Sequence, residues 1–138
     1  MAAVVAKLED SRSDVRYGAL RTLGMLEPAT LAQHADAVVA MLEDSDQNVR
    51  YWALETLRQL EPPTLTQHAA AVVARLEDSD RRVRKMALAT LDEFEPPTLA
   101  QHASAVVAWL EDDEWTVRLI ALETLGKLHP ASLAQYGD

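Results

Sequence analysis

The feature that most constrains this chain is a repeat of 34 residues. Leu8, Leu42, Leu76 and Leu110 open successive copies, as the differences 42−8, 76−42 and 110−76 show. A fixed period of this length is the signature of a solenoid, in which each unit packs mainly on its neighbours. We therefore predict a single repeat domain over 1–138, with residues 1–7 as the end of a preceding repeat helix. The expected units span about 8–41, 42–75, 76–109 and 110–138.

Each unit carries two helical patterns. The first follows Thr30, Thr64, Thr98 and Ser132, each with a Gln three residues later (Gln33, Gln67, Gln101 and Gln135), which predicts a capping box at the helix start. The second begins at the Val-Arg pairs 15–16, 49–50, 83–84 and 117–118. We call these the Gln-His helix and the Val-Arg helix. Both show apolar stripes at helical spacing and neither alternates with period two, so the predicted fold is all-α.

The Val-Arg pattern L-x-D-x-x-x-x-V-R-x-x-A-L-x-T-L-x-x-L, as at 42–60, resembles HEAT-like repeats. It is most similar to the short repeats of bilin-lyase-like proteins and of designed HEAT-like binding proteins. The resemblance implies a right-handed α-solenoid, a HEAT/armadillo-like superhelix of stacked antiparallel helix pairs. It also implies that the Val-Arg helices line the concave side.

The composition limits the classes of partner that the chain can bind. The chain has 13 Lys and Arg against 22 Asp and Glu, and this net charge of −9 repels phosphate backbones, so we expect no nucleic-acid partner. The N-terminal apolar run is too short for a signal peptide or a membrane span, so we expect no membrane partner. Cys is absent, which excludes disulfides and thiolate metal sites. Together these features favour a cytoplasmic protein.

Comparison of the four copies separates scaffold from candidate binding positions. The Val, Arg, Ala, Leu and Thr of the pattern recur in every copy and predict the stacking core; we expect Arg16, Arg50, Arg84 and Arg118 to pair with Asp10, Asp44, Asp78 or Asp112 of the same or the next unit. Positions 13, 14, 17, 18, 21 and 25 and their counterparts vary. Of these, positions 13, 14, 17, 21 and 25 match the randomised binding positions of designed HEAT-like binders. Many carry the large apolar, aromatic or basic side chains that are enriched in interface cores. The candidate partner-binding residues are Tyr17, Tyr51, Trp52, Arg81, Arg82, Lys85, Met86, Trp115, Leu119 and Ile120. For Trp52, Met86 and Ile120, partial burial against adjacent helices is an equally good interpretation.

No pattern indicates an active site. His34, His68 and His102 recur once per unit, and stacked helices lie about 8–10 Å apart, too far for these imidazoles to share one metal. The Glu-Asp pairs at 9–10, 43–44, 77–78 and 111–112 are predicted turn acids. No HExxH, GxSxG or glycine-rich phosphate loop occurs. We therefore expect no enzyme activity, no catalytic residue, no cofactor and no metal.

The leading functional hypothesis is a scaffold that binds a protein or peptide on its concave face. Its partner would offer apolar anchors and one or two carboxylates opposite the third unit. The alternative is a structural module that self-associates, as a homodimer or an open assembly, through uncapped ends or through the apolar face of the fourth unit. A third hypothesis is chromophore handling, as in bilin-lyase-like proteins. The near-identity of the copies fits either recent duplication or consensus design.

Overall fold

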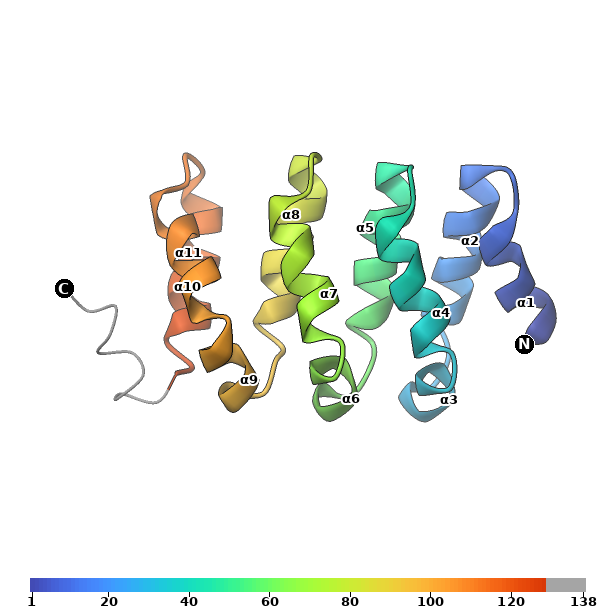
Figure 1. The fold of residues 1–138 in the computed structure, drawn as a ribbon, viewed down its shortest axis with the longest axis horizontal. Coiled ribbons are helices and arrows are strands. Elements are labelled where there is room, and N and C mark those ends of the chain that lie inside the picture. The colour runs from blue at the N-terminus through green and yellow to red at the C-terminus, as the bar shows by residue number, and fades with distance from the viewer. Residues whose placement is uncertain (129–138) are drawn as a thin grey trace.

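The computed structural model describes residues 1–128, which form a row of helix pairs (Figure 1). The described residues contain helices and turns and no strand. None of the helices in this range is long and apolar enough to cross a membrane. The fold is the right-handed α-solenoid of stacked helix pairs that the resemblance to HEAT-like repeats implies.

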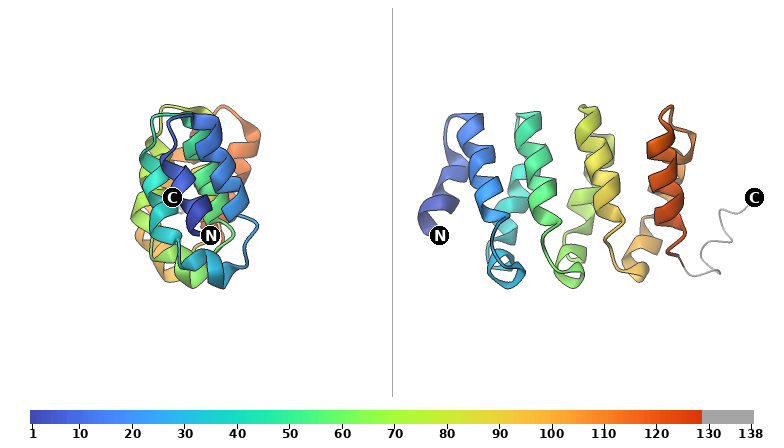
Figure 2. Two further views of the ribbon diagram at one scale, coloured as in Figure 1. Left: turned by 90° about the vertical axis from the view of Figure 1, so that its right-hand side faces the viewer. Right: turned by 180° about the vertical axis from the view of Figure 1, so that it is seen from behind.

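The Val-Arg helices have equal lengths of 11 residues and form one layer of the row. They are α2 (Ser13–Leu23), α5 (Gln47–Leu57), α8 (Arg81–Leu91) and α11 (Trp115–Leu125). Figure 2 shows this layer from behind, with the four helices side by side. We call its outer surface the Val-Arg face.

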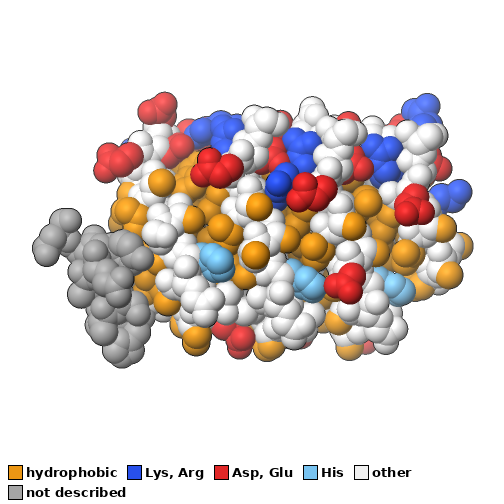
Figure 3. Space-filling model, in the orientation of Figure 1, with side chains coloured by type: hydrophobic (Ala, Val, Ile, Leu, Met, Phe, Trp, Pro, Cys, Tyr) orange, Lys and Arg blue, Asp and Glu red, His pale blue; other side chains and the backbone are white. Residues whose placement is uncertain are grey.

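The second layer is built from shorter helices, each continued by a 3₁₀ turn. The helices are α1 (Ala2–Ala6), α4 (Ala35–Ala40), α7 (Ala69–Ala74) and α10 (Ala103–Val107). The 3₁₀ turns are η1 (Lys7–Glu9), η2 (Met41–Glu43), η3 (Arg75–Glu77) and η4 (Ala108–Glu111). Figure 3 shows His side chains at intervals across this layer.

The predicted capping boxes are wrong, and the Gln-His helix is two helices. The first piece begins at a proline two residues before the expected Thr, in α3 (Pro28–Ala32), α6 (Pro62–Thr66) and α9 (Pro96–Gln101), without a side-chain cap. Proline suits this first helical position because its ring fixes φ and its missing N–H needs no partner there. The N–H groups of Gln33 and His34 bond three residues back, which ends α3 before α4 starts. The box expected at Ser132 and Gln135 lies outside the described residues.

One continuous apolar core runs between the two layers. Val49, Ala53, Leu54 and Leu57 of α5 are fully or almost fully buried, as are the counterparts in α8. The expected apolar stripe of the Gln-His pattern is also in the core, with Leu31, Ala35, Val38 and Leu42 buried.

Candidate partner-binding surface

The turn before each Val-Arg helix is fixed by an aspartate. The carboxylates of Asp10, Asp44, Asp78 and Asp112 each accept the backbone N–H two residues later at 2.9 Å. In the second and third units a further aspartate caps the helix: Asp46 accepts from the N–H groups of Asn48 and Val49, and Asp80 does the same in α8. These turns set where each Val-Arg helix begins and so align the varying positions of neighbouring units.

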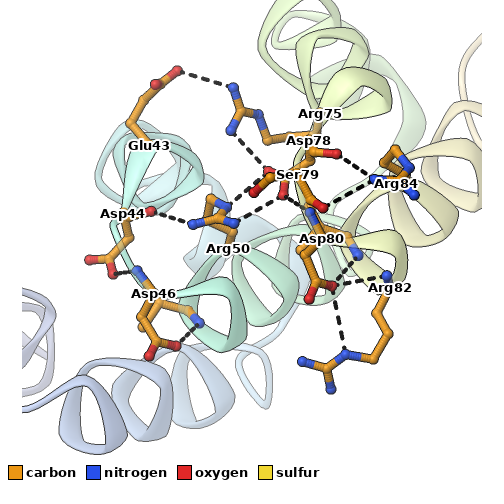
Figure 4. A network of polar contacts seen from close by, with 12 residues as sticks. Glu43, Asp44, Asp46, Arg50, Arg75, Asp78, Ser79, Asp80, Arg82 and Arg84 are labelled. Carbon is orange, nitrogen blue, oxygen red and sulfur yellow. Dashed lines mark hydrogen bonds and ion pairs between the residues drawn. The ribbon is translucent and has the colours of Figure 1, made fainter.

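Two of the four expected arginine–aspartate pairs form, and both join neighbouring units. The Arg50 guanidinium donates from Nε and Nη2 to the Asp78 carboxylate at 2.9 and 3.0 Å, and Arg16 binds Asp44 in the same way. Figure 4 shows Asp78 at the centre of this network, with Arg75 as a further donor. Burial raises the pKa of Asp78, but the hydrogen bonds from Arg50 and from the backbone N–H of Asp80 lower it by more, so its pKa lies below the ordinary value.

The ten candidate residues all lie on the Val-Arg helices. Tyr17 is on α2; Tyr51 and Trp52 are on α5; Arg81, Arg82, Lys85 and Met86 are on α8; Trp115, Leu119 and Ile120 are on α11. Trp115 and Leu119 are exposed, whereas Tyr17 and Ile120 are half-buried and packed against the core. The structure does not gather all ten into one site.

Five of the candidates line a groove of about 420 Å³ between α5 and α8. Its lining residues are Asn48, Tyr51, Trp52, Arg82, Lys85, Met86 and Ala89. We call it the α5/α8 groove. It is apolar where Trp52, Met86 and Ala89 lie and polar where Asn48, Arg82 and Lys85 lie. Apolar walls with a few placed polar groups are typical of ligand sites.

Aromatic rings and guanidinium groups are stacked along this groove. The rings of Tyr51 and Trp52 meet edge to face, with centroids 5.7 Å apart and planes at 87°. The Arg82 guanidinium lies 5.7 Å from the Tyr51 centroid, and that of Arg21 lies 5.1 Å from the Trp52 centroid. Such contacts hold rings and cations in place. Trp52 therefore forms a wall with a fixed orientation, shared by a smaller groove between α2 and α5.

Acidic residues of the fourth unit bind two of the three basic candidates. Arg81 donates to Glu114 at 2.9 Å and to Asp112 at 2.6 Å, and Lys85 donates to Glu114 at 2.9 Å. The hydrogen bonds from Lys85 and then from Arg81 lower the pKa of Glu114, and the bond from Arg81 lowers the pKa of Asp112. The charges of Arg81 and Lys85 are thus largely neutralised by acidic residues of the fourth unit.

Arg82 is the basic candidate whose charge stays available at the groove. It is exposed, and its Nη2 donates to the neutral Oδ1 of Asn48 at 2.8 Å. Its nearest carboxylate contact is a 3.7 Å approach of Nε to Asp80. Asn48 and Ala89 complete the groove but were not among the ten candidates. Both stand at positions that vary between the repeat units, so the variation that indicated the other residues was present at these two as well.

Sequence reasoning missed Leu122, which is 58% exposed. Its counterparts Leu20, Leu54 and Leu88 are completely buried between units. The internal comparison placed Leu122 in the stacking core because the same residue recurs in all four copies. A residue type that recurs in every copy does not reveal how far each side chain is buried.

The recurring histidines lie in the second layer, away from the α5/α8 groove. His34, His68 and His102 are the half-buried cap residues of α4, α7 and α10. Within residues 1–128 no group of three or more His, Cys, Asp or Glu side chains is arranged to hold a metal ion.

The family model described as HEAT repeats matches residues 1–73 and 69–136 of the chain. No curated protein matches the sequence of this chain. A designed armadillo repeat protein in complex with the peptide (KR)4 superposes with a TM-score of 0.79 and 18% identity, over 98% of this chain and 69% of that one. A second designed armadillo repeat protein has a TM-score of 0.78, 18% identity and the same coverages. A crystallised engineered protein has a TM-score of 0.75 and 18% identity, over 96% of this chain and 61% of that one. At these identities the structural likeness shows the fold alone.

Proposed function

Since this chain belongs to the HEAT-repeat family, we propose that it is a non-catalytic scaffold that binds a protein or peptide on its Val-Arg face. The observation that carries this proposal is the α5/α8 groove, in which Tyr51, Trp52 and Met86 form apolar walls beside Arg82. A structural neighbour with this fold binds a peptide, which supports the kind of partner.

The apolar wall suits a large side chain of the partner. Trp and Tyr contribute most at interfaces when they are rigid and partly enclosed, because little rotamer freedom is lost on binding. Trp52 meets this condition through its contacts with Tyr51 and Arg21. A groove of about 420 Å³ has room for one or two side chains of an extended peptide.

The charge at the groove suits an acidic group of the partner. Arg82 presents a guanidinium that can bind a carboxylate with two parallel hydrogen bonds. Arg81 and Lys85 add less, because their charges already face Glu114. We propose that the partner segment places an apolar residue against Trp52 and an Asp or Glu next to it. Of the three basic candidates in the third unit, Arg82 is then the one that binds the partner's carboxylate.

Trp115 and Leu119 extend the proposed surface along α11. Both are exposed and lie outside the α5/α8 groove, so they would contact a second part of a longer partner. Their contribution is expected to be smaller than that of Trp52, because exposed contacts remain in water while enclosed ones exclude it.

The test is selection of binders from a library of displayed random peptides, followed by affinity measurement by calorimetry. We expect enriched peptides to pair a large apolar residue with Asp or Glu. Trp52→Ala should weaken binding of the selected peptides about fivefold or more, and Trp115→Ala by less, because truncation of an enclosed aromatic anchor costs more than about 1 kcal/mol.

Arg82→Gln should weaken peptides that contain the acidic residue and leave their alanine analogues unchanged. Gln67→Ala, at the exposed C-cap of α6, is the control and should leave affinity unchanged. Selected peptides that bind Trp52→Ala as tightly as the natural chain would rule out the α5/α8 groove as the binding site.

A further inference from the structure

Glu114, the residue before α11, uses its carboxylate differently from the acidic residues before α5 and α8. Asp46, Asp80 and Glu114 have closely similar extended backbone conformations at the starts of their helices. Asp46 and Asp80 each accept two backbone N–H groups of their own helix, whereas Glu114 makes no side-chain cap. The capping position favours a short side chain such as that of Asp, and Glu is one methylene longer. The helix α11 therefore starts without the cap that α5 and α8 have.

The Glu114 carboxylate instead reaches back across the junction to α8. Its two oxygens accept hydrogen bonds from Arg81 Nε and from Lys85 Nζ, both at 2.9 Å. The corresponding positions of the first and second units carry no charge: they hold Ser13 and Tyr17, and Gln47 and Tyr51. The glutamate thus follows directly after the one unit that has two cations at these positions.

Lys85 differs from Arg81 in where it lies and in what else binds it. Lys85 lines the α5/α8 groove, and Arg81 does not. Arg81 also binds the carboxylate of Asp112 at 2.6 Å, whereas within residues 1–128 the Lys85 ammonium binds only that of Glu114. Loss of the Glu114 carboxylate would therefore leave Arg81 paired and make the charge of Lys85 available at the groove.

The groove has two cations close enough for two acidic residues of one partner. Arg82 and Lys85 stand three residues apart on α8, so their side chains are neighbours on one face of the helix, and both line the groove. The Glu114 carboxylate, however, already binds the Lys85 ammonium. A second acidic residue of the partner would meet this carboxylate instead of a free cation, and like charges placed together at an interface oppose binding.

We propose that Glu114 is a specificity-determining residue of the α5/α8 groove. By binding Lys85, it restricts the groove to partner segments with one acidic residue, which binds Arg82. This inference rests on the proposed function, because it concerns the partner of the same groove. It goes further because the selecting residue belongs to the fourth unit and lies outside the groove lining, where its carboxylate takes the place of a second acidic residue of the partner.

The test uses a peptide that is selected on the natural chain and whose binding depends on Trp52 and on one acidic residue. Each other position of this peptide is changed in turn to Asp and to Ala, and the affinities are measured by calorimetry. On the natural chain, no second Asp should bind more tightly than Ala at the same position. On Glu114→Gln, at least one position should favour Asp over Ala by about threefold, the gain typical of a partly exposed ion pair.

Further variants assign this gain to the Lys85 ammonium. Glu114→Asp keeps the charge but shortens the side chain to that of the residues that cap α5 and α8, so it should give the same gain. Lys85→Gln combined with Glu114→Gln should lose the gain, because this double variant has no ammonium at the groove. Glu111→Gln, which removes a carboxylate at an exposed position of η4, is the matched control and should behave like the natural chain. Circular dichroism checks the fold of every variant.

The outcomes separate this inference from the proposed function. A gain on Glu114→Gln that disappears with Lys85→Gln would support both. Trp52-dependent binding without any gain on Glu114→Gln would overturn the role of Glu114 and leave the proposed function standing. A gain that survives Lys85→Gln, or that appears equally on Glu111→Gln, would also overturn that role, because overall charge would then explain it. If no selected peptide depends on Trp52, the α5/α8 groove is not the binding site and both proposals fail.

Discussion

The junction between α5 and α8 and the junction between α8 and α11 are held together differently. At the first, the Arg50 guanidinium binds Asp78, and the two side chains are 10% and 2% exposed. At the second, the Arg84 guanidinium binds the carbonyls of Asp78 and Ser79, as Arg50 binds that of Asp44, but within residues 1–128 it binds no carboxylate of the next unit.

At that second junction Arg81 takes over the pairing with the next unit. Its side chain is 37% exposed, and its partners Asp112 and Glu114 are 13% and 41% exposed. A buried bidentate pair holds a junction in one geometry, because burial prevents water from solvating the two charges if they separate. Solvated pairs contribute little and are screened by salt. We therefore expect α8 and α11 to separate first when the protein is stressed.

The largest expected effect comes from removing the buried carboxylate. Asp78→Ala leaves the Arg50 guanidinium buried without its partner and should lower the free energy of unfolding by about 3 kcal/mol. Urea denaturation followed by circular dichroism measures this loss. Asp112→Ala should cost clearly less, because Arg81 stays hydrated.

Asp10→Ala is the matched control for this comparison. Asp10 makes the same turn bond as Asp78 but binds no side chain across a junction within residues 1–128. The free energy of unfolding lost in Asp10→Ala therefore measures the contribution of the turn bond alone. Equal losses for Asp78→Ala and Asp10→Ala would mean that the buried ion pair adds nothing to stability.

Acid should weaken both junctions through the carboxylates with lowered pKa values. The pKa of Asp78 in the folded protein lies below its ordinary value of 3.8. The unfolded chain therefore takes up the proton at higher pH than the folded chain does. The stabilisation is complete above the ordinary value and is lost as pH falls through the folded one.

The pH dependence of stability can be assigned to individual carboxylates by substitution. Urea midpoints measured from neutral pH down to pH values below 3.8 should fall more steeply for the natural chain than for Asp78→Asn, which has no proton to gain. Asp112→Asn should also flatten the curve, since the pKa of Asp112 is lowered by Arg81. Identical slopes for the natural chain and both variants would contradict these pKa directions.

The smallest expected effect is that of salt. Screening extends over about 10 Å at about 0.1 M ionic strength and over about 3 Å at about 1 M, and it acts mainly on exposed pairs. Raising NaCl across this range should speed amide hydrogen exchange in α11 and leave α5 almost unchanged. Glu114→Gln removes the shared carboxylate of Arg81 and Lys85, so it should abolish most of the salt response. A larger response in α5 than in α11 would reverse the assignment of the weaker junction.

Much of the fold could be read from the sequence because the same pattern occurs four times. The period, the apolar stripes and the absence of alternation predicted stacked helix pairs. The Val-Arg helices are present, and each begins two residues before the Val-Arg pair at which it was expected to start. The Gln-His pattern was misread because proline at the first helical position competes with the Thr-x-x-Gln cap, and bonds to the third residue back then end the helix.

The candidate site was only partly predictable, for a reason that Arg81 and Leu122 illustrate. Comparing copies showed which positions vary, and five of the ten candidates line one groove. It could not show that Glu114 and Asp112 reach back to Arg81, because that pairing depends on the distance between neighbouring helices. Nor could it show that Leu122 is exposed while its identical counterparts are buried.

The sequence by itself determined the repeat, the helix pairs and the residues that form the core, because these depend on local spacing that recurs in each unit. The tertiary structure alone decided which charges are neutralised, where the α5/α8 groove opens and that Leu122 is exposed while its counterparts are buried. These properties depend on contacts between units, and two units with the same local pattern can make different contacts.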